Sequence, residues 1–182
     1  MSKRAIVVVD LQNEYLPAGK LALSGIDEAL NNAARVIAHA RSEGDTVINI
    51  RHESTDPEAP FFTPGSDGVQ IHESVAPAQS DAVIVKNFPN AFLKTDLKQI
   101  LDGKGIQEVT IIGAMSHMCI DATARAASDF GYKTTVVHDA CATRDLEFLG
   151  QNVPAAQVHT ALMSALAFAY ASVISADAYL AR

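Results

Sequence analysis

The sequence contains no tryptophan and only two cysteines, Cys119 and Cys141, among its 182 residues. A chain of this length can bury a core large enough to fold without disulfide bonds, so we expect both cysteines to be reduced thiols. No CxxC, HExxH or other clustered spacing of Cys and His is present. These absences predict a protein that holds no metal and needs no cofactor.

Long hydrophobic runs and clusters of positive charge are also missing. No apolar run reaches the roughly 18 residues that a membrane span needs, and the first apolar stretch is too short for a signal peptide. The 14 Lys and Arg residues against 21 Asp and Glu residues give a formal net charge of −7. Nucleic-acid binding needs a basic surface, so we expect no nucleic-acid partner. The lack of an apolar span or signal peptide favours a cytoplasmic protein without a membrane partner, and we expect its partner to be a small-molecule substrate.

Short runs rich in Val and Ile alternate with longer segments of helical spacing. Most of the short runs are apolar on both faces, as in strands of a parallel sheet that helices cover on both sides. The alternation predicts a single Rossmann-like domain over 1–182, an α/β fold built as a three-layer α/β/α sandwich. The predicted strands are Ala5–Leu11, Thr46–His52, Ala82–Lys86, Val109–Ala114, Lys133–His138 and Ser172–Ala176, and the predicted helices are Ile26–Arg41, Thr95–Leu101, Met118–Phe130 and Val153–Tyr170.

One insertion, Glu53–Asp81, interrupts this alternation with four prolines and no sustained periodicity. A loop of this length inside a compact domain is usually functional, so we expect either a lid or a contact with a partner subunit.

Residues with reactive side chains follow the carboxyl ends of the predicted strands, where open α/β sheets bind ligands. Asp10 ends the first strand, Lys86 ends the third, and Cys119 lies near the start of the helix after the fourth. A carboxylate and an ammonium that end buried strands are costly to bury singly, which favours their pairing. A helix N-terminus and a nearby lysine would lower the pKa of the thiol, making Cys119 a nucleophile near neutral pH, with Asp10 as its base.

These residues resemble a known family, the isochorismatase-like cysteine hydrolases, which includes nicotinamidases and N-carbamoylsarcosine amidase. The matching segments are Val8–Asn13 (VDLQN after Val8), Lys86–Phe92 (KNFPNAF) and Gly113–Ile120 (GAMSHMCI). The likeness spans nearly the whole chain. It implies a six-stranded parallel sheet in the order 3-2-1-4-5-6 and a homo-oligomer, either a dimer or a larger assembly.

The resemblance also implies the site. Asp10, Lys86 and Cys119 correspond to the catalytic Asp-Lys-Cys triad, and a cis peptide bond precedes Met115. The backbone N–H groups of Met115 and Cys119 then form the oxyanion hole. The presence of Cys119 favours hydrolysis of a C–N bond in a small amide or ureido substrate through a thioester acyl-enzyme, rather than the vinyl-ether cleavage of isochorismatases proper.

The metal motif of nicotinamidases, Asp-x-His after the second strand, is incomplete, since the chain reads Ile50-Arg51-His52. Two isolated histidines, His52 and His72, make a poor metal site, so we predict no metal and leave their roles open. We expect the substrate pocket to be lined by a set of aromatic and imidazole side chains, namely Tyr15, Phe61, Phe62, Phe88, Phe92 and His117.

Two other functions compete with the hydrolase. A catalytically silent small-molecule-binding or scaffold module of the same fold would leave Cys119 unreactive. A phosphatase using Asp10 as nucleophile would need Asp-x-Asp, and position 12 is Gln. No GxGxxG or GxxxxGK[ST] motif follows the first strand, which argues against nucleotide binding.

Overall fold

The computed structural model describes residues 3–182. Its central sheet has six parallel strands in the order β3-β2-β1-β4-β5-β8, which is 3-2-1-4-5-6 when the strands of this sheet alone are counted, so the predicted fold class and strand order are confirmed. The strands are β1 (Arg4–Val9), β2 (Thr46–His52), β3 (Ala82–Lys86), β4 (Glu108–Ala114), β5 (Lys133–Ala142) and β8 (Ser172–Ile174).

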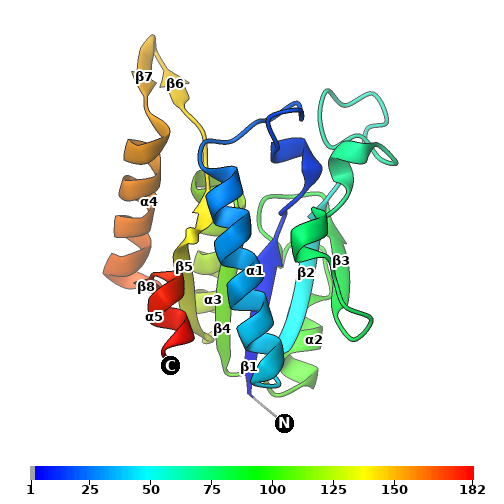
Figure 1. Cartoon of the computed structure of the whole chain (residues 1–182), viewed down its shortest axis with the longest axis vertical. Helices are drawn as coiled ribbons and strands as arrows, with labels where there is room; N and C mark the ends of the chain where they lie inside the picture. Colours follow the sequence, from blue (N-terminus) through cyan, green and yellow to red (C-terminus); the bar gives the residue numbers. More distant parts are fainter. Residues whose placement is uncertain (1–2) are drawn as a thin grey trace.

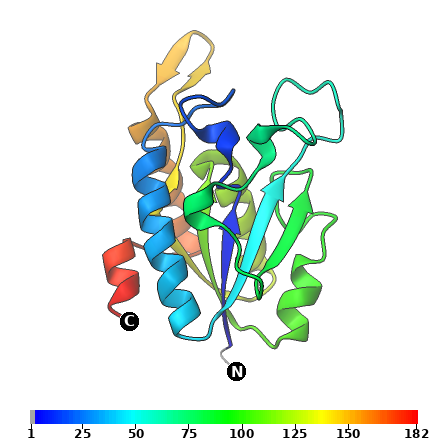
Figure 2. The same ribbon diagram turned by 45° about the vertical axis from the view of Figure 1, so that its right-hand side comes forward.

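Helices cover both faces of this sheet and complete three layers (Figures 1 and 2). One core cluster joins the sheet to α1 (Ile26–Ser42) and α5 (Ala176–Leu180). A second cluster joins the opposite face to α2 (Leu97–Gly103), α3 (Asp121–Asp129) and α4 (Ala155–Ala169).

Strand β1 shows why the apolar runs become central strands. Ile6 and Val8 are buried in the cluster under α1, while Val7 and Val9 are buried in the cluster on the other face. Successive side chains of a strand point to opposite faces, so a strand buried on both faces must be apolar throughout.

Three features differ from the prediction. The helix predicted from Met118 is instead a π-helix, η4 (Ser116–Ile120), followed by α3. Helix α5 was not predicted, nor was an antiparallel hairpin of β6 (Leu146–Phe148) and β7 (Gln151–Val153), which projects beyond the three layers (Figure 1). In residues 3–182, no helix is long and apolar enough to cross a membrane.

The Glu53–Asp81 insertion lies between β2 and β3 and contains two short 3-10 helices, η2 (Asp67–Val69) and η3 (Glu73–Val75). A third such helix, η1 (Asn13–Tyr15), follows β1 directly and lies beside η2.

Candidate active site

Four adjacent strands bring reactive side chains to one edge of the sheet. Asp10 follows β1, His52 ends β2, Lys86 ends β3, and Cys119 lies in η4 just after β4. Because the strands are parallel and neighbouring, their carboxyl ends lie at the same end of the molecule (Figure 1). His52 and Lys86 are also register partners across β2 and β3.

The ammonium of Lys86 joins three of these side chains. Its Nζ lies 2.7 Å from Asp10 Oδ2, 3.3 Å from Cys119 Sγ and 2.8 Å from His52 Nδ1. An ammonium has three protons and no acceptor, so each proton has one partner here. The side chains of Lys86 and Asp10 have no exposed surface, which makes this a fully buried ion pair.

His52 is a member of this site whose role the sequence left open. Lys86 can only donate, so Nδ1 of His52 accepts and the ring is neutral. Burial and the charge of Lys86 lower the pKa of His52 to about 4, in agreement with a neutral ring. Gln12 fixes its backbone, since Oε1 accepts from the His52 N–H at 2.8 Å and Nε2 donates to the His52 carbonyl at 2.9 Å.

Burial determines the protonation of the acid and the thiol. Burial raises the pKa of Asp10 above its ordinary 3.8, although the charge of Lys86 opposes this. The pKa of Cys119 is raised to about 12, chiefly by burial and secondly by the negative charge of Asp10. The expected low thiol pKa is therefore wrong, because the desolvation of a side chain that is only 5% exposed exceeds the effect of the lysine. The resting site holds a thiol.

The same residues do not fit a divalent metal. Asp10, His52 and Cys119 offer potential ligand atoms within 4.8 Å of one another. The ammonium of Lys86, however, lies within 3.3 Å of a donor atom of each, so it already supplies the positive charge that the cluster can hold. A metal ion would have to displace a charged lysine from its three partners.

The backbone around the site has special geometry at three positions. Asp10 has a φ of 53°, in the left-handed region that Asp and Asn tolerate better than most residues. Gly113 has a φ of 126°, and a Cβ atom there would lie 1.9 Å from the carbonyl oxygen of Val9. The absence of a side chain therefore allows β4 to approach β1. The peptide bond between Ala114 and Met115 is cis.

Two of the six predicted pocket residues lie against the site. The ring of Phe62 lies 5.0 Å from that of His52 and 5.3 Å from that of Tyr15, and both Phe62 and Tyr15 are buried. Phe61 packs on Phe62 at 6.2 Å and is largely exposed. The insertion thus places an aromatic wall beside His52.

The other three predicted pocket residues are placed differently from one another. His117, in η4 with Cys119, lies 2.6 Å from Thr143 Oγ1 through its Nδ1. Phe88 follows β3 and is half-buried. Phe92 packs into the core cluster under α2 and α3, where its ring lies 5.2 Å from that of Phe130. Phe92 is therefore separated from the aromatic wall at Tyr15 and Phe62, which belongs to the opposite core cluster.

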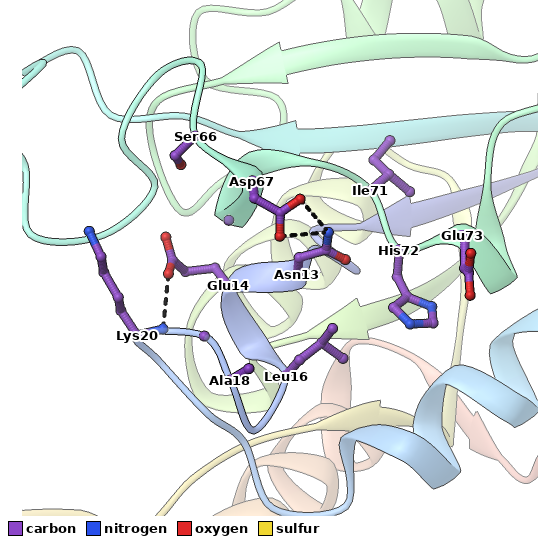
Figure 3. A pocket seen from close by; sticks show the side chains of 12 residues that line it. Asn13, Glu14, Leu16, Ala18, Lys20, Ser66, Asp67, Ile71, His72 and Glu73 are labelled. Carbon is purple, nitrogen blue, oxygen red and sulfur yellow. Dashed lines mark hydrogen bonds between the residues drawn. The ribbon is translucent and has the colours of Figure 1, made fainter.

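Side chains just beyond Asp10 anchor the insertion at two points. Glu14 Oε2 accepts the N–H of Phe62 at 2.7 Å, and Gln12 Nε2 donates to the carbonyl of Val69 at 2.9 Å. The second oxygen of Glu14 accepts the N–H of Lys20 (Figure 3). Both anchors are buried.

A cavity of about 580 Å³ lies outside these anchors, between η1 and η2–η3 (Figure 3). Its lining includes Asn13, Asp67, Glu73 and His72, and Asn13 Nδ2 lies 3.4 Å from both carboxylate oxygens of Asp67. None of the residues around Lys86 Nζ lines it. The structure therefore places His72 in this outer cavity, apart from His52.

Comparisons with known proteins identify the family of the chain. The Isochorismatase domain model matches residues 4–178. An uncharacterized isochorismatase family protein of Bacillus subtilis, YddQ, is 46% identical over 97% of this chain and 98% of its own. An isochorismatase-type hydrolase from Oleispira antarctica has a solved structure with a TM-score of 0.95 and 52% identity, covering 98% of this chain and 96% of that one.

A further relative carries a known type of activity in its name. Maleamate amidohydrolase of Pseudomonas putida is 28% identical over 78% of this chain and 73% of its own. The family model covers nearly the whole chain, and the fold agrees with that of the solved isochorismatase-type structure. The chain therefore belongs to the isochorismatase family and is one of its hydrolases.

Proposed function

We propose that this protein hydrolyses a C–N bond of a small amide or ureido substrate through a thioester on Cys119, with Asp10, Lys86 and Cys119 as its catalytic triad. The observation that carries the proposal is the position of Lys86 Nζ, 2.7 Å from the acid and 3.3 Å from the sulfur. A single ammonium can then stabilise whichever of the two groups bears the negative charge.

The first step begins from a thiol and a carboxylate. Asp10 takes the proton of Cys119 as the substrate binds, and its raised pKa makes it a stronger base than an ordinary carboxylate. The thiolate attacks the carbonyl carbon, an S–C bond forms, and the carbonyl oxygen becomes an oxyanion. The backbone N–H groups of Met115 and Cys119 donate to this oxyanion, and each such donor contributes about 3 kcal/mol.

The remaining steps return the enzyme to its starting state. Asp10 delivers its proton to the nitrogen as the C–N bond breaks, which releases ammonia or an amine and leaves a thioester. A water molecule then gives a proton to Asp10 while its oxygen attacks the thioester carbon. The C–S bond breaks, the acid product leaves, and the Cys119 sulfur regains the proton from Asp10.

The aromatic wall favours a small substrate. Phe62 packs against His52, the neighbour of Lys86, and Tyr15 packs on Phe62, so the two buried rings limit the space on that side of the triad. We propose that Tyr15, Phe61, Phe62, Phe88 and His117 line the pocket. We propose the same of Phe92, which lies in the core cluster that also contains Cys119.

A screen of primary amides, ureido acids and lactams for ammonia or acid release tests the function. Cys119→Ala and Cys119→Ser should lower turnover of any hydrolysed compound by at least about 10³-fold, because no thioester can form. Mass spectrometry of quenched wild type should detect the acyl group on Cys119. Cys141→Ala is the control, since the thiol of this second buried cysteine donates to the carbonyl of Val137 and the variant should leave turnover in place.

Unchanged hydrolysis by Cys119→Ala would refute the mechanism. A silent binding module would show neither turnover nor an adduct with a substrate-like aldehyde, which should otherwise form a thiohemiacetal on Cys119.

A further inference from the structure

The hydrogen-bond partners of the Ser116 hydroxyl lie in β5 and α4. Ser116 is the first residue of η4, the π-helix that carries Cys119, and it has no exposed surface. Its Oγ lies 3.2 Å from the carbonyl oxygen of Ala142 in β5 and 2.8 Å from Nδ1 of His159 in α4.

The chemistry of these three groups fixes the direction of both hydrogen bonds. A serine hydroxyl has one proton, and a carbonyl oxygen can only accept. The hydroxyl proton therefore goes to Ala142, and Nδ1 of His159 must carry a proton that it donates to Ser116 Oγ. The neutral ring of His159 is then the Nδ1–H tautomer, which is the opposite of the tautomer required at His52.

The surroundings of His159 favour this neutral form. Its ring is 6.3 Å from that of His138, and both rings line a cavity of about 410 Å³ between the N-terminal ends of α1 and α4. Burial and His138 lower the pKa of His159, while Asp139 opposes the shift. Two acidic side chains line this cavity, Asp139 and Glu28 of α1.

We infer that His159 is a positioning residue for the thiol chemistry: through Ser116 it ties the segment that carries Met115 and Cys119 to α4 and β5. This inference rests on the proposed function, because it concerns the same nucleophile and oxyanion donors. A second hydrogen bond holds η4, between His117 Nδ1 and Oγ1 of Thr143, just beyond β5. Two consecutive residues of η4, Ser116 and His117, are therefore bonded to neighbouring elements. Loss of the His159 tie should misplace Cys119, and a shift of about 1 Å can cost up to about 100-fold in rate.

The first test is independent of turnover. Long-range ¹H–¹⁵N NMR of the wild-type protein should show His159 with a protonated Nδ1 and a bare Nε2 at neutral pH. A protonated Nε2 with a bare Nδ1 would overturn the inference. Failure of the proposed function would leave this readout unaffected, so the two failures can be told apart.

The second test compares matched variants. His159→Ala should lower kcat for the amide found in the screen, and the rate of Cys119 alkylation by iodoacetamide, by about tenfold, with KM nearly unchanged. His159→Asn keeps a side-chain N–H near the position of Nδ1 and should restore most of the loss. His138→Ala removes the other histidine of the same cavity, which has no bond to Ser116, and should behave like wild type.

Ser116→Ala completes a double-mutant cycle. Ser116→Ala and the double variant with His159→Ala should lose about the same activity as His159→Ala alone, because all three break one connection. Additive losses, or an equal loss in His138→Ala, would show a general packing effect and overturn the inference. If His159→Ala does not fold, the NMR tautomer and the activity of His159→Asn still decide it.

Discussion

The Nζ atom of Lys86 and the Nδ1 atom of His52 lie 2.8 Å apart, so a buried ammonium donates to an imidazole that must stay neutral. This contact completes the partners of Lys86, because Nζ also forms an ion pair with Asp10 and donates to the sulfur of Cys119. The lysine is thereby held by a neutral imidazole, a carboxylate and a thiol at once.

Stability should depend on the protonation of His52. Its pKa is about 4 in the folded protein and 6.5 in an unfolded chain, so the unfolded state binds more protons between these values. The stability associated with the neutral ring is present above pH 6.5 and is lost as the pH falls toward 4. His52→Asn cannot be protonated, so thermal unfolding followed over this pH range should show a shallower loss than in wild type. His72→Asn, in the outer cavity, should retain the wild-type slope, and equal slopes in His52→Asn and wild type would contradict the assignment.

Removing the lysine charge should destabilise the fold more than an exposed ion pair would. Lys86→Met leaves Asp10 buried without a partner, and breaking a buried pair in this way costs about 3 kcal/mol. Urea unfolding should show this loss, and Asp10→Asn in the same background should recover a large part of it. Lys98→Met breaks a solvent-exposed pair with Asp102 and should lower the free energy of unfolding much less than Lys86→Met does. A double variant that is less stable than Lys86→Met would refute the pairing.

The pH profile of hydrolysis should report Asp10 and not a preformed thiolate. Asp10 must be ionised to take the thiol proton, and burial raises its pKa above 3.8. Plots of kcat/KM should therefore fall on the acid side with an apparent pKa above that value and then be flat. If free thiolate were required, its pKa of about 12 would make kcat/KM rise roughly tenfold per pH unit through the alkaline range. Circular dichroism at each pH would confirm that the protein remains folded.

The approach of β4 to β1 at Gly113 should tolerate no side chain. Gly113→Ala would place a Cβ 1.9 Å from a backbone oxygen at a φ of 126°, and we expect it to cost more than about 3 kcal/mol of unfolding free energy. Gly103→Ala has open space at the end of α2 and should be neutral or stabilising by about 0.5 kcal/mol. Chemical denaturation of the two variants compares them directly, and similar stabilities would contradict the close approach.

Much of the architecture could be predicted because its strands are apolar on both faces. The runs at Thr46–His52 and Ala82–Lys86 became strands with the predicted bounds. The β6–β7 hairpin was missed because its strands have three residues each and are largely exposed, so they give no hydrophobic signal. The turn between them, Leu149 and Gly150, has positive φ at both positions and offers Gly150 as the one local sign of a tight turn.

The site was predicted less completely, for a physical reason. Asp10, Lys86 and Cys119 could be named from their positions after strands and from the family resemblance. The same positional rule applies to His52, which also ends a strand. From the sequence, His52 is considered only as a metal ligand, which misses that its imidazole accepts a hydrogen bond from Lys86. The direction of the Cys119 pKa shift depends on burial by distant segments, which no local pattern contains.

The anchors of the insertion have a consequence for substrate entry. Gln12 and Glu14 hold Val69 and Phe62, and both belong to the short stretch that follows Asp10. An outward movement of the insertion at Phe62 or Val69 would therefore break a buried hydrogen bond to a side chain that lies within four residues of Asp10. Opening of the insertion and displacement of the segment that follows Asp10 should accordingly occur together.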